Sequence, residues 1–194
     1  MTRLRRLLRL LPALLLAAAL PAAGQGPPPG TLLPELPLPD PRDESARSYL
    51  GVTGPSGFTA AAIAADVLLI EIFSMYCPHC QREAPMVNEV FSRIEADPRL
   101  RGRVKMIGIG AGNTPFEVDY FRKTYGVRFP LFPDPDFRLH KRLGEVRTPY
   151  FIGVKLKSPQ GPLVYCSRAG GAASAGELMK LLLSGSSLEP KESP

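Results

Sequence analysis

The stretch VLLIEIFSMYCPHC, residues 67–80, decides how this chain folds. Its first seven residues, 67–73, form an apolar run that is broken only by Glu71, as is typical of a strand buried on both faces. Beyond the second cysteine, apolar residues recur at the spacing of one helix face between Val87 and Ile94. We therefore predict a buried strand, a tight turn and a helix that begins near Pro78, the start of a β-α-β unit.

The rest of the chain alternates further strand and helix patterns, with no internal repeat. We expect strands at 104–109, 129–132, 150–156 and 163–167, and helices at 116–125, at 137–143 and after Ser174. The sequence Pro-Asp-Pro-Asp at 133–136 signals a turn, and Ser174 with Glu177 has the spacing of a capping box. The order β-α-β-α-β-α-β-β-α predicts an α/β fold with one core.

Residues 1–24 have the pattern of a secretory signal peptide. A basic start leads into an apolar run from Leu10 to Leu20, and small residues follow up to Gly24. A membrane anchor needs about 20 apolar residues, whereas this run is shorter and contains Pro12. We therefore expect export to the periplasm with cleavage before Gln25; retention of the segment as an anchor is the alternative.

The basic character of the chain comes mainly from this segment. The full sequence has 24 basic and 18 acidic residues, and four of the arginines lie in residues 1–24, so the remainder carries a net charge of about +2. No basic run that could follow a phosphate backbone remains. We therefore expect no nucleic-acid partner.

Composition divides the remaining residues into three parts. Residues 25–50 are crowded with proline and are interpreted as a proline-rich linker or N-terminal extension. Residues 51–184 hold the strand and helix patterns and are expected to form one domain. Residues 185–194 are rich in Ser, Pro and charge, and are expected to be a disordered tail.

Cys77 and Cys80 carry the chemistry that the sequence predicts. A cysteine at a helix N-terminus has a lowered pKa, because free backbone N–H groups and the helix dipole favour the thiolate. Pro78 suits the first helical turn, where its missing N–H leaves no bond unmade. With two residues between them, Cys80 can attack a mixed disulfide formed at Cys77 and release the partner. We predict Cys77 as the nucleophile and Cys80 as the resolving thiol of a redox-active disulfide.

Two other interpretations of the pair stay open at this stage. One is a structural disulfide, although such bridges seldom span two residues at a helix start. The other is half of a zinc site, whose further ligands would have to come from Cys166, His140 or His79. We expect no metal and no cofactor.

Two neighbours of the cysteines are candidates for tuning them. His79 lies between the cysteines, where a partly cationic imidazole would favour the Cys77 thiolate; the alternative is an exposed ring without a role. Glu71 is a carboxyl in an apolar strand, expected beneath the site with a raised pKa that suits proton transfer for Cys80. The alternative for Glu71 is a register that takes it to solvent or to a structural partner.

These residues resemble the thioredoxin superfamily, and residues 58–183 are similar to its TlpA/ResA-like branch of extracytoplasmic thiol-disulfide oxidoreductases. Glu71 stands where thioredoxins carry a buried acid, and Pro85 stands where their long helix has a proline. The resemblance implies a thioredoxin-like fold, with a central mixed β-sheet flanked by helices. It also implies that Pro149 is a cis-proline facing the cysteines, and that Thr148 offers backbone hydrogen bonds to a bound peptide.

Two stretches refine the resemblance. Residues 105–136 are similar to the extra strand and helix that TlpA-like proteins and peroxiredoxins insert, although the Thr-x-x-Cys arrangement of peroxide reduction is absent at Cys77. The motif Cys-Pro-His-Cys is closer to DsbA-type oxidases, whereas Gln-Arg-Glu-Ala-Pro after it follows TlpA. The Cys-Pro-His-Cys motif favours an oxidase, and the Gln-Arg-Glu-Ala-Pro sequence favours a reductase.

Three further residues are singled out. Cys166 lies in a predicted strand and is expected to be a buried, inert thiol; a regulatory or intermolecular disulfide is the alternative. His140 is expected on the solvated face of a short helix. Glu83, one turn after Cys80, either tunes the site, as a similarly placed acid does in ResA-like proteins, or is a plain surface acid.

The function that these patterns predict is an exported thiol-disulfide oxidoreductase acting on protein thiols and disulfides. We expect a monomeric, TlpA-like reductase whose dithiol is restored by a membrane electron donor. A DsbA-like oxidase running the same chemistry backwards is the alternative. A chaperone that binds copper through Cys77, Cys80 and a histidine is a third interpretation.

Overall fold

The computed structural model describes residues 24–41, 43–54 and 56–188. The predicted signal peptide, except for its last residue, and residues 189–194 of the predicted tail lie outside these ranges. Within them, no helix is long and apolar enough to cross a membrane.

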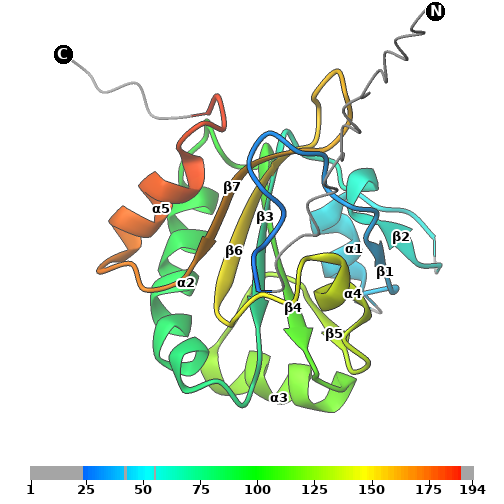
Figure 1. Ribbon diagram of the computed structural model, residues 1–194, viewed down its shortest axis with the longest axis vertical. Coiled ribbons are helices and arrows are strands. Elements are labelled where there is room, and N and C mark those ends of the chain that lie inside the picture. The colour runs from blue at the N-terminus through cyan, green and yellow to red at the C-terminus, as the bar shows by residue number, and fades with distance from the viewer. Residues whose placement is uncertain (1–23, 42, 55, 189–194) are drawn as a thin grey trace, which may run out of the picture.

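A five-stranded mixed sheet forms the centre of the molecule (Figure 1). Its order is β5-β4-β3-β6-β7, with β5 (Leu131–Asp134), β4 (Val104–Ala111), β3 (Val67–Phe73), β6 (Tyr150–Lys155) and β7 (Leu163–Ala169). β4 runs parallel to β3 and β5 parallel to β4, whereas β6 is antiparallel to β3 and β7 to β6. β3 is thus the central strand, paired with β4 along its whole length and with β6 from Val67 to Ile72.

Helices pack on both faces of this sheet. One core cluster includes residues of α2 (Pro78–Ala96), α3 (Pro115–Tyr125) and α5 (Ala175–Leu183). The cluster on the other face includes residues of α1 (Glu44–Leu50), α4 (Arg138–Arg142) and the short 3-10 helix Ala60–Ala62. The expected α/β fold, a central mixed sheet flanked by helices, is confirmed.

The alternation of side chains along β3 explains why its sequence is apolar throughout. Leu69 and Phe73 face the α2 side, whereas Leu68 and Ile70 face the α1 side, and all are buried. Because successive side chains of a strand point to opposite faces, Glu71 lies on the α2 side, with Leu69 and Phe73. The acid and the helix that carries Cys80 therefore share one face of the sheet.

Two details differ from the sequence expectations. β5 lies two residues later than expected, and Pro133, read as part of a turn, is inside it. Proline is tolerated there because β5 is an edge strand. At α5 the Ser174 side chain accepts from the Glu177 backbone N–H as expected, but the Glu177 carboxylate accepts from Ala173.

The interpretation of residues 25–50 as a linker is wrong. They include β1 (Pro37–Leu38), which pairs with β2 (Phe58–Thr59), and the helix α1. Leu36, Leu38 and Leu50 are fully buried in the core cluster on that face. The prolines exclude long runs of strand hydrogen bonds here, but the leucines between them supply apolar side chains that pack on the sheet.

The first part of this segment, residues 24–33, is referred to below as the N-terminal strap. It crosses in front of the sheet as the bluest part of the ribbon in Figure 1. The backbone N–H of Gly24 donates to the Gly144 carbonyl (2.9 Å), and Gly30 and Thr31 exchange hydrogen bonds with Val164 of β7 (2.8 and 2.9 Å). The strap thus joins the free edge of the sheet to the loop that leads into β6.

Candidate active site

Cys77 occupies the N-cap of α2, immediately after the turn that follows β3. Its Sγ accepts a hydrogen bond from the backbone N–H of Cys80 at 3.4 Å, and Pro78 takes the first helical position. The side chain is half-buried, and Cys80 is completely buried one turn further along the helix. Both thiols are free. The structure therefore presents one sulfur toward solvent and keeps the other beneath it.

Hydrogen bonds at the helix start favour the ionised form of Cys77. Burial opposes ionisation of this thiol, but hydrogen bonds with the side chains of Thr148 and Cys80 and with two backbone N–H groups at the start of α2 outweigh it, so the pKa of Cys77 is lowered. Burial strongly raises the pKa of Cys80, and its contact with Cys77 adds to the effect. The two thiols thus have opposite tendencies, and the outer one ionises more readily.

Glu71 lies where the sequence places it, beneath the cysteines in the α2-side core. Its side chain is only 4 % exposed. Burial, followed by the charge of Glu83, raises its pKa to about 8. Glu71 in turn raises the pKa of Cys80. The strand register that would take this carboxyl to solvent is not the one observed.

Glu83 is half-buried rather than a plain surface acid. One carboxylate oxygen, Oε2, is buried without a hydrogen-bond partner among the described residues. A Cβ built at Gly170 would meet both this oxygen and Cγ of Pro149, each at 2.7 Å. Glu83 and Pro149 therefore both pack against the same glycine, which leaves no room there for a side chain.

The loop before β6 completes the site opposite Cys77. The Thr148–Pro149 peptide bond is cis, as the resemblance implied, and Pro149 is buried. The Cys77 thiol donates to the Thr148 carbonyl at 3.3 Å. Two loops far apart in the sequence thus meet at the reactive sulfur.

His79 lies on the surface between the two cysteines. Its ring is exposed, and Nδ1 lies 2.9 Å from the Arg82 guanidinium. It is the backbone N–H of His79 that lowers the pKa of Cys77.

Two residues that the sequence pattern does not single out hold the turn before Cys77. Asn113 is completely buried, and its Oδ1 accepts from the Met75 backbone N–H at 2.8 Å. Gln81 Nε2 donates to the carbonyl of the same Met75 at 2.7 Å. Asn113 follows β4, and the carboxyl ends of neighbouring parallel strands meet at one edge, so a polar residue there was the available signal.

A cavity of about 480 Å³ opens beside Cys77. Residues of the turn after β3, of α4 and of the loop before β6 line it, including Tyr76, Phe137, His140, Arg147 and Thr148. The expectation that His140 is a solvated surface residue is wrong. It is half-buried, and its Nε2–H donates to the Val146 carbonyl at 2.8 Å, because this short helix packs back onto the loop.

Two further expectations concern metal binding and the third cysteine. Among the residues that the structure describes, no group of three or more His, Cys, Asp or Glu side chains gathers in a way that could hold a metal ion. Cys166 is half-buried against the α2-side core, near the Leu181 carbonyl (3.7 Å), and burial raises its pKa. It is therefore less enclosed than expected, and its thiol is kept protonated.

Solved structures of thiol-disulfide exchange proteins have the same fold. A secreted disulfide oxidoreductase of Mycobacterium tuberculosis, homologous to E. coli DsbE, aligns with a TM-score of 0.56 at 17% identity, over 77% of this chain and 95% of that one. A thiol:disulfide interchange protein of the thioredoxin family from Chlorobium tepidum aligns with a TM-score of 0.59 at 16% identity, over 82% and 98%. These likenesses show that the fold is thioredoxin-like.

A third similar structure is the thioredoxin domain of a thiol-disulfide oxidoreductase from Bacteroides vulgatus, with a TM-score of 0.59 at 10% identity, over 81% of this chain and 97% of that one. Among curated proteins, none is significantly similar to this chain. The sequence profile of the AhpC/TSA family, however, matches residues 54–161, which contain both active-site cysteines and the cis-proline. Since this match spans more than half of the sequence, the chain belongs to the AhpC/TSA family.

Proposed function

We propose that this protein is an exported thiol-disulfide oxidoreductase that reduces disulfides of other proteins through Cys77 and Cys80. The observation that carries the proposal is the asymmetry of the two thiols. Cys77 is accessible and has a lowered pKa, whereas Cys80 is buried and has a raised one. A structural disulfide would need no such difference, but attack followed by resolution does.

The reaction begins when the Cys77 thiolate attacks one sulfur of a partner disulfide. A bond forms between Cys77 and that sulfur, and the other partner sulfur leaves as a thiolate that takes up a proton. Cys80 then attacks Cys77, which closes the Cys77–Cys80 disulfide and releases the second partner thiol. Two electrons pass from the protein to the partner. A membrane electron donor of the dithiol or quinol class would restore the reduced pair.

Glu71 is proposed to move the proton of Cys80. Cys80 must lose its proton to attack, and its pKa is strongly raised by burial. A carboxyl with a pKa of about 8 can both accept and return a proton near neutral pH. Pro78 and His79 are proposed to tune the pair, and Thr148 and Pro149 to align the partner backbone against Cys77.

The principal alternative is an oxidase that runs the same exchange in the opposite direction, as the Cys-Pro-His-Cys motif suggests. A cationic His79 would support it by stabilising the reduced form of the pair. Equilibration with glutathione measures the direction. A potential near about −270 mV, the thioredoxin value, supports a reductase, and one near about −120 mV, the DsbA value, supports an oxidase. The difference in reduction potential between a His79→Pro variant and the unmodified protein measures the contribution of the histidine.

Trapping tests the exchange itself. Cys80→Ser should accumulate a mixed disulfide between Cys77 and a partner protein, because the resolving thiol is missing. Cys77→Ser should form none, and Cys166→Ser should behave as the unmodified protein. A mixed disulfide that forms equally well in Cys77→Ser would overturn the proposed roles.

Export is proposed from the signal-peptide pattern of residues 1–24. The similar Mycobacterium tuberculosis protein is described as secreted, which supports the same compartment for this chain. Fusion of the N-terminal residues to a reporter enzyme that is active only outside the cytoplasm measures export. N-terminal sequencing of the mature protein would show whether cleavage precedes Gln25.

A further inference from the structure

The cavity beside Cys77 is placed to receive the chain next to a partner cysteine. One wall is the turn that carries Tyr76, directly before the nucleophile, and another is the loop with Arg147 and Thr148. The Thr148 carbonyl lies 3.3 Å from the Cys77 sulfur. Two lining residues, Tyr76 and Thr148, thus adjoin Cys77, so the cavity lies within reach of the residues that flank a disulfide bound there.

The lining of the cavity is mixed, with exposed aromatic rings and a cation. Tyr76 and Phe137 are 64% and 43% exposed, so both offer apolar surface at the cavity to a molecule that enters it. Arg147 is exposed, and its guanidinium has no ion-pair partner among the described residues. Lys141, next to the lining residue His140, is exposed as well and likewise has no described ion-pair partner.

The acidic group tied to this wall is already engaged. The Tyr76 hydroxyl donates to Glu117, and the Thr114 backbone N–H donates to the same carboxylate. The Glu117 carboxylate is thus held at the start of α3 by the hydroxyl end of Tyr76, and not by Arg147. The cation on the cavity is left for a group that comes from outside.

Resting on the proposed function, we infer that the cavity selects partner proteins whose reactive cysteine is flanked by acidic residues, with Arg147 as the specificity-determining residue. An acidic side chain would pair with the guanidinium while the aliphatic part of the partner chain contacts Tyr76 and Phe137. The exchange reaction at sulfur is the same for every partner. Arg147 affects only which partner proteins stay bound long enough to react.

Three short peptides test this specificity. Each has one cysteine flanked on both sides by Glu, Ala or Lys, activated as a mixed disulfide with 2-thiopyridine. Attack by the reduced protein forms the Cys77–peptide disulfide and releases thiopyridone, which is followed by absorbance. Dividing each rate by that of the same peptide with a small neutral thiol removes the intrinsic reactivity of the peptide.

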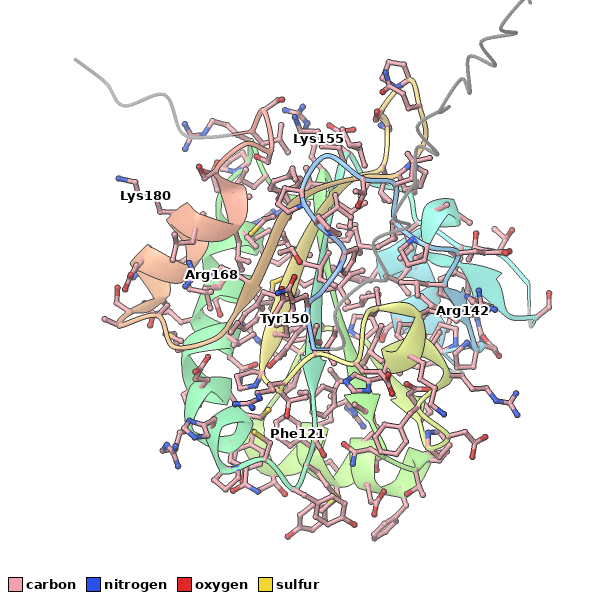
Figure 2. The ribbon with its side chains drawn as sticks, viewed as in Figure 1. Phe121, Arg142, Tyr150, Lys155, Arg168 and Lys180 are labelled. Carbon is pink, nitrogen blue, oxygen red and sulfur yellow. The ribbon has the colours of Figure 1, made fainter. Side chains whose placement is uncertain are left out.

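The unmodified protein should react with the Glu peptide about fivefold faster than with the Lys peptide at low salt, the range of an exposed ion pair. The preference should shrink in 0.5 M salt, because the screening length is then only about 4 Å and the attraction between exposed charges is weakened. Arg147→Glu should reverse it, and Arg147→Gln should abolish it. Lys180→Glu is the matched charge change, because Lys180 lies on α5, on the opposite side of the molecule from α4 and its labelled Arg142 (Figure 2).

The outcomes separate this inference from the proposed function. If the three peptides react equally, or if Arg147→Glu keeps the preference, the inference is wrong while the exchange reaction stands. If no peptide reacts although the small thiol releases thiopyridone, the proposed function itself fails. A gain of rate toward the Lys peptide in Arg147→Glu also shows that the variant is folded.

Discussion

Glu71 is the residue whose sequence context says most about its surroundings. In an apolar strand that is buried on both faces, a carboxyl has no route to water, so its burial could be predicted from residues 67–73 alone. The structure adds the second carboxyl, Glu83, which further raises its pKa. That neighbour comes from the helix above the strand, and only the packed structure shows the two acids to be close enough to interact.

Replacing Glu71 with Gln should change how stability depends on pH. Its pKa is about 8 in the folded protein, above the ordinary value of 4.5, so the folded chain binds this proton more tightly than the unfolded chain. The resulting stabilisation is complete below pH 4.5 and is lost as the pH rises through about 8. The size is up to about 5 kcal/mol, since each pKa unit corresponds to about 1.4 kcal/mol.

The measurement is the free energy of unfolding in urea at pH 5 and at pH 9. Between these values Glu71→Gln should lose less stability than the unmodified protein, because its amide does not titrate. Both proteins should carry Cys80→Ser, because Glu71 raises the pKa of Cys80 and the titration of that thiol would otherwise differ between them. Parallel curves for the two proteins would mean that Glu71 ionises normally in the fold.

The two histidines show where prediction from residue type stops. His79 and Arg82 are three residues apart on α2, so their contact could have been anticipated once the helix was predicted. The hydrogen bond from His140 to the Val146 carbonyl could not, because it depends on how the chain turns back after α4. Residue type and helical spacing indicate neighbours within an element but not across a loop.

At the scale of elements, the turn before Cys77 is held from two sides. Asn113, after β4, binds the N–H of Met75, and Gln81, in the first turns of α2, binds its carbonyl. Because both backbone polar groups of Met75 are held, Cys77 two residues later has a defined position at the helix start. The loop after β4 thus contributes directly to the position of Cys77.

Asn113→Ala should slow the attack of Cys77 about tenfold, because a misplaced nucleophile loses much of the advantage of orientation. Asn88→Ala is the matched control, since Asn88 also bonds a backbone group, the Tyr125 carbonyl at 2.8 Å, but between α2 and α3 at a distance from the turn. Both variants should lose about 1 to 3 kcal/mol of stability. Only Asn113→Ala should lose rate.

Stopped-flow rates with an activated disulfide, recorded from pH 5 to pH 9, measure both the rate and the pKa of Cys77 in each variant. A rate loss shared by the two variants would indicate general loosening of the fold. An unaltered rate in Asn113→Ala would show that Gln81 and the helix start hold the turn without it.

The elements themselves were predictable to differing degrees. The continuous apolar runs of β3 and β4 predict these strands well. A strand that is covered on both faces of the sheet needs apolar residues at nearly every position. The predicted range of β5 differs from the observed one because Pro133 is typical of a turn. Only the observed position of β5 at the edge of the sheet explains why a proline is tolerated in it. The linker interpretation of residues 25–50 fails because a high proline content predicts an extended backbone. It does not predict whether the leucines between the prolines pack on the rest of the protein.

On the scale of the whole molecule, the N-terminal strap connects parts that the sequence keeps far apart. Gly144 has a positive φ of 91°, and a Cβ there would lie 2.1 Å from the Gln25 carbonyl oxygen. The strap and the loop before β6 therefore fit together only because residue 144 has no side chain. This closeness was invisible in the sequence, where the two glycines at 24 and 144 have no feature in common.

Gly144→Ala should destabilise the protein by about 1 to 3 kcal/mol more than Gly102→Ala does. Both glycines have a positive φ, but a Cβ at Gly102 would meet no atom within 4 Å. The difference in the free energy of unfolding between the two variants therefore isolates the clash with the strap from the backbone strain that they share. Equal losses would show that the strap moves aside easily.

The strap also determines what the edges of the sheet present to other molecules. An edge strand offers unpaired N–H and C=O groups to any chain that can align with it, and such edges are where aggregation begins. β5 is short and interrupted by Pro133, whereas the outward-facing N–H and C=O of Val164 in β7 are already bonded to the strap. A chain that lacks this segment would offer part of β7 to the β7 strand of a second molecule, and concentrated solutions of it would associate edge to edge.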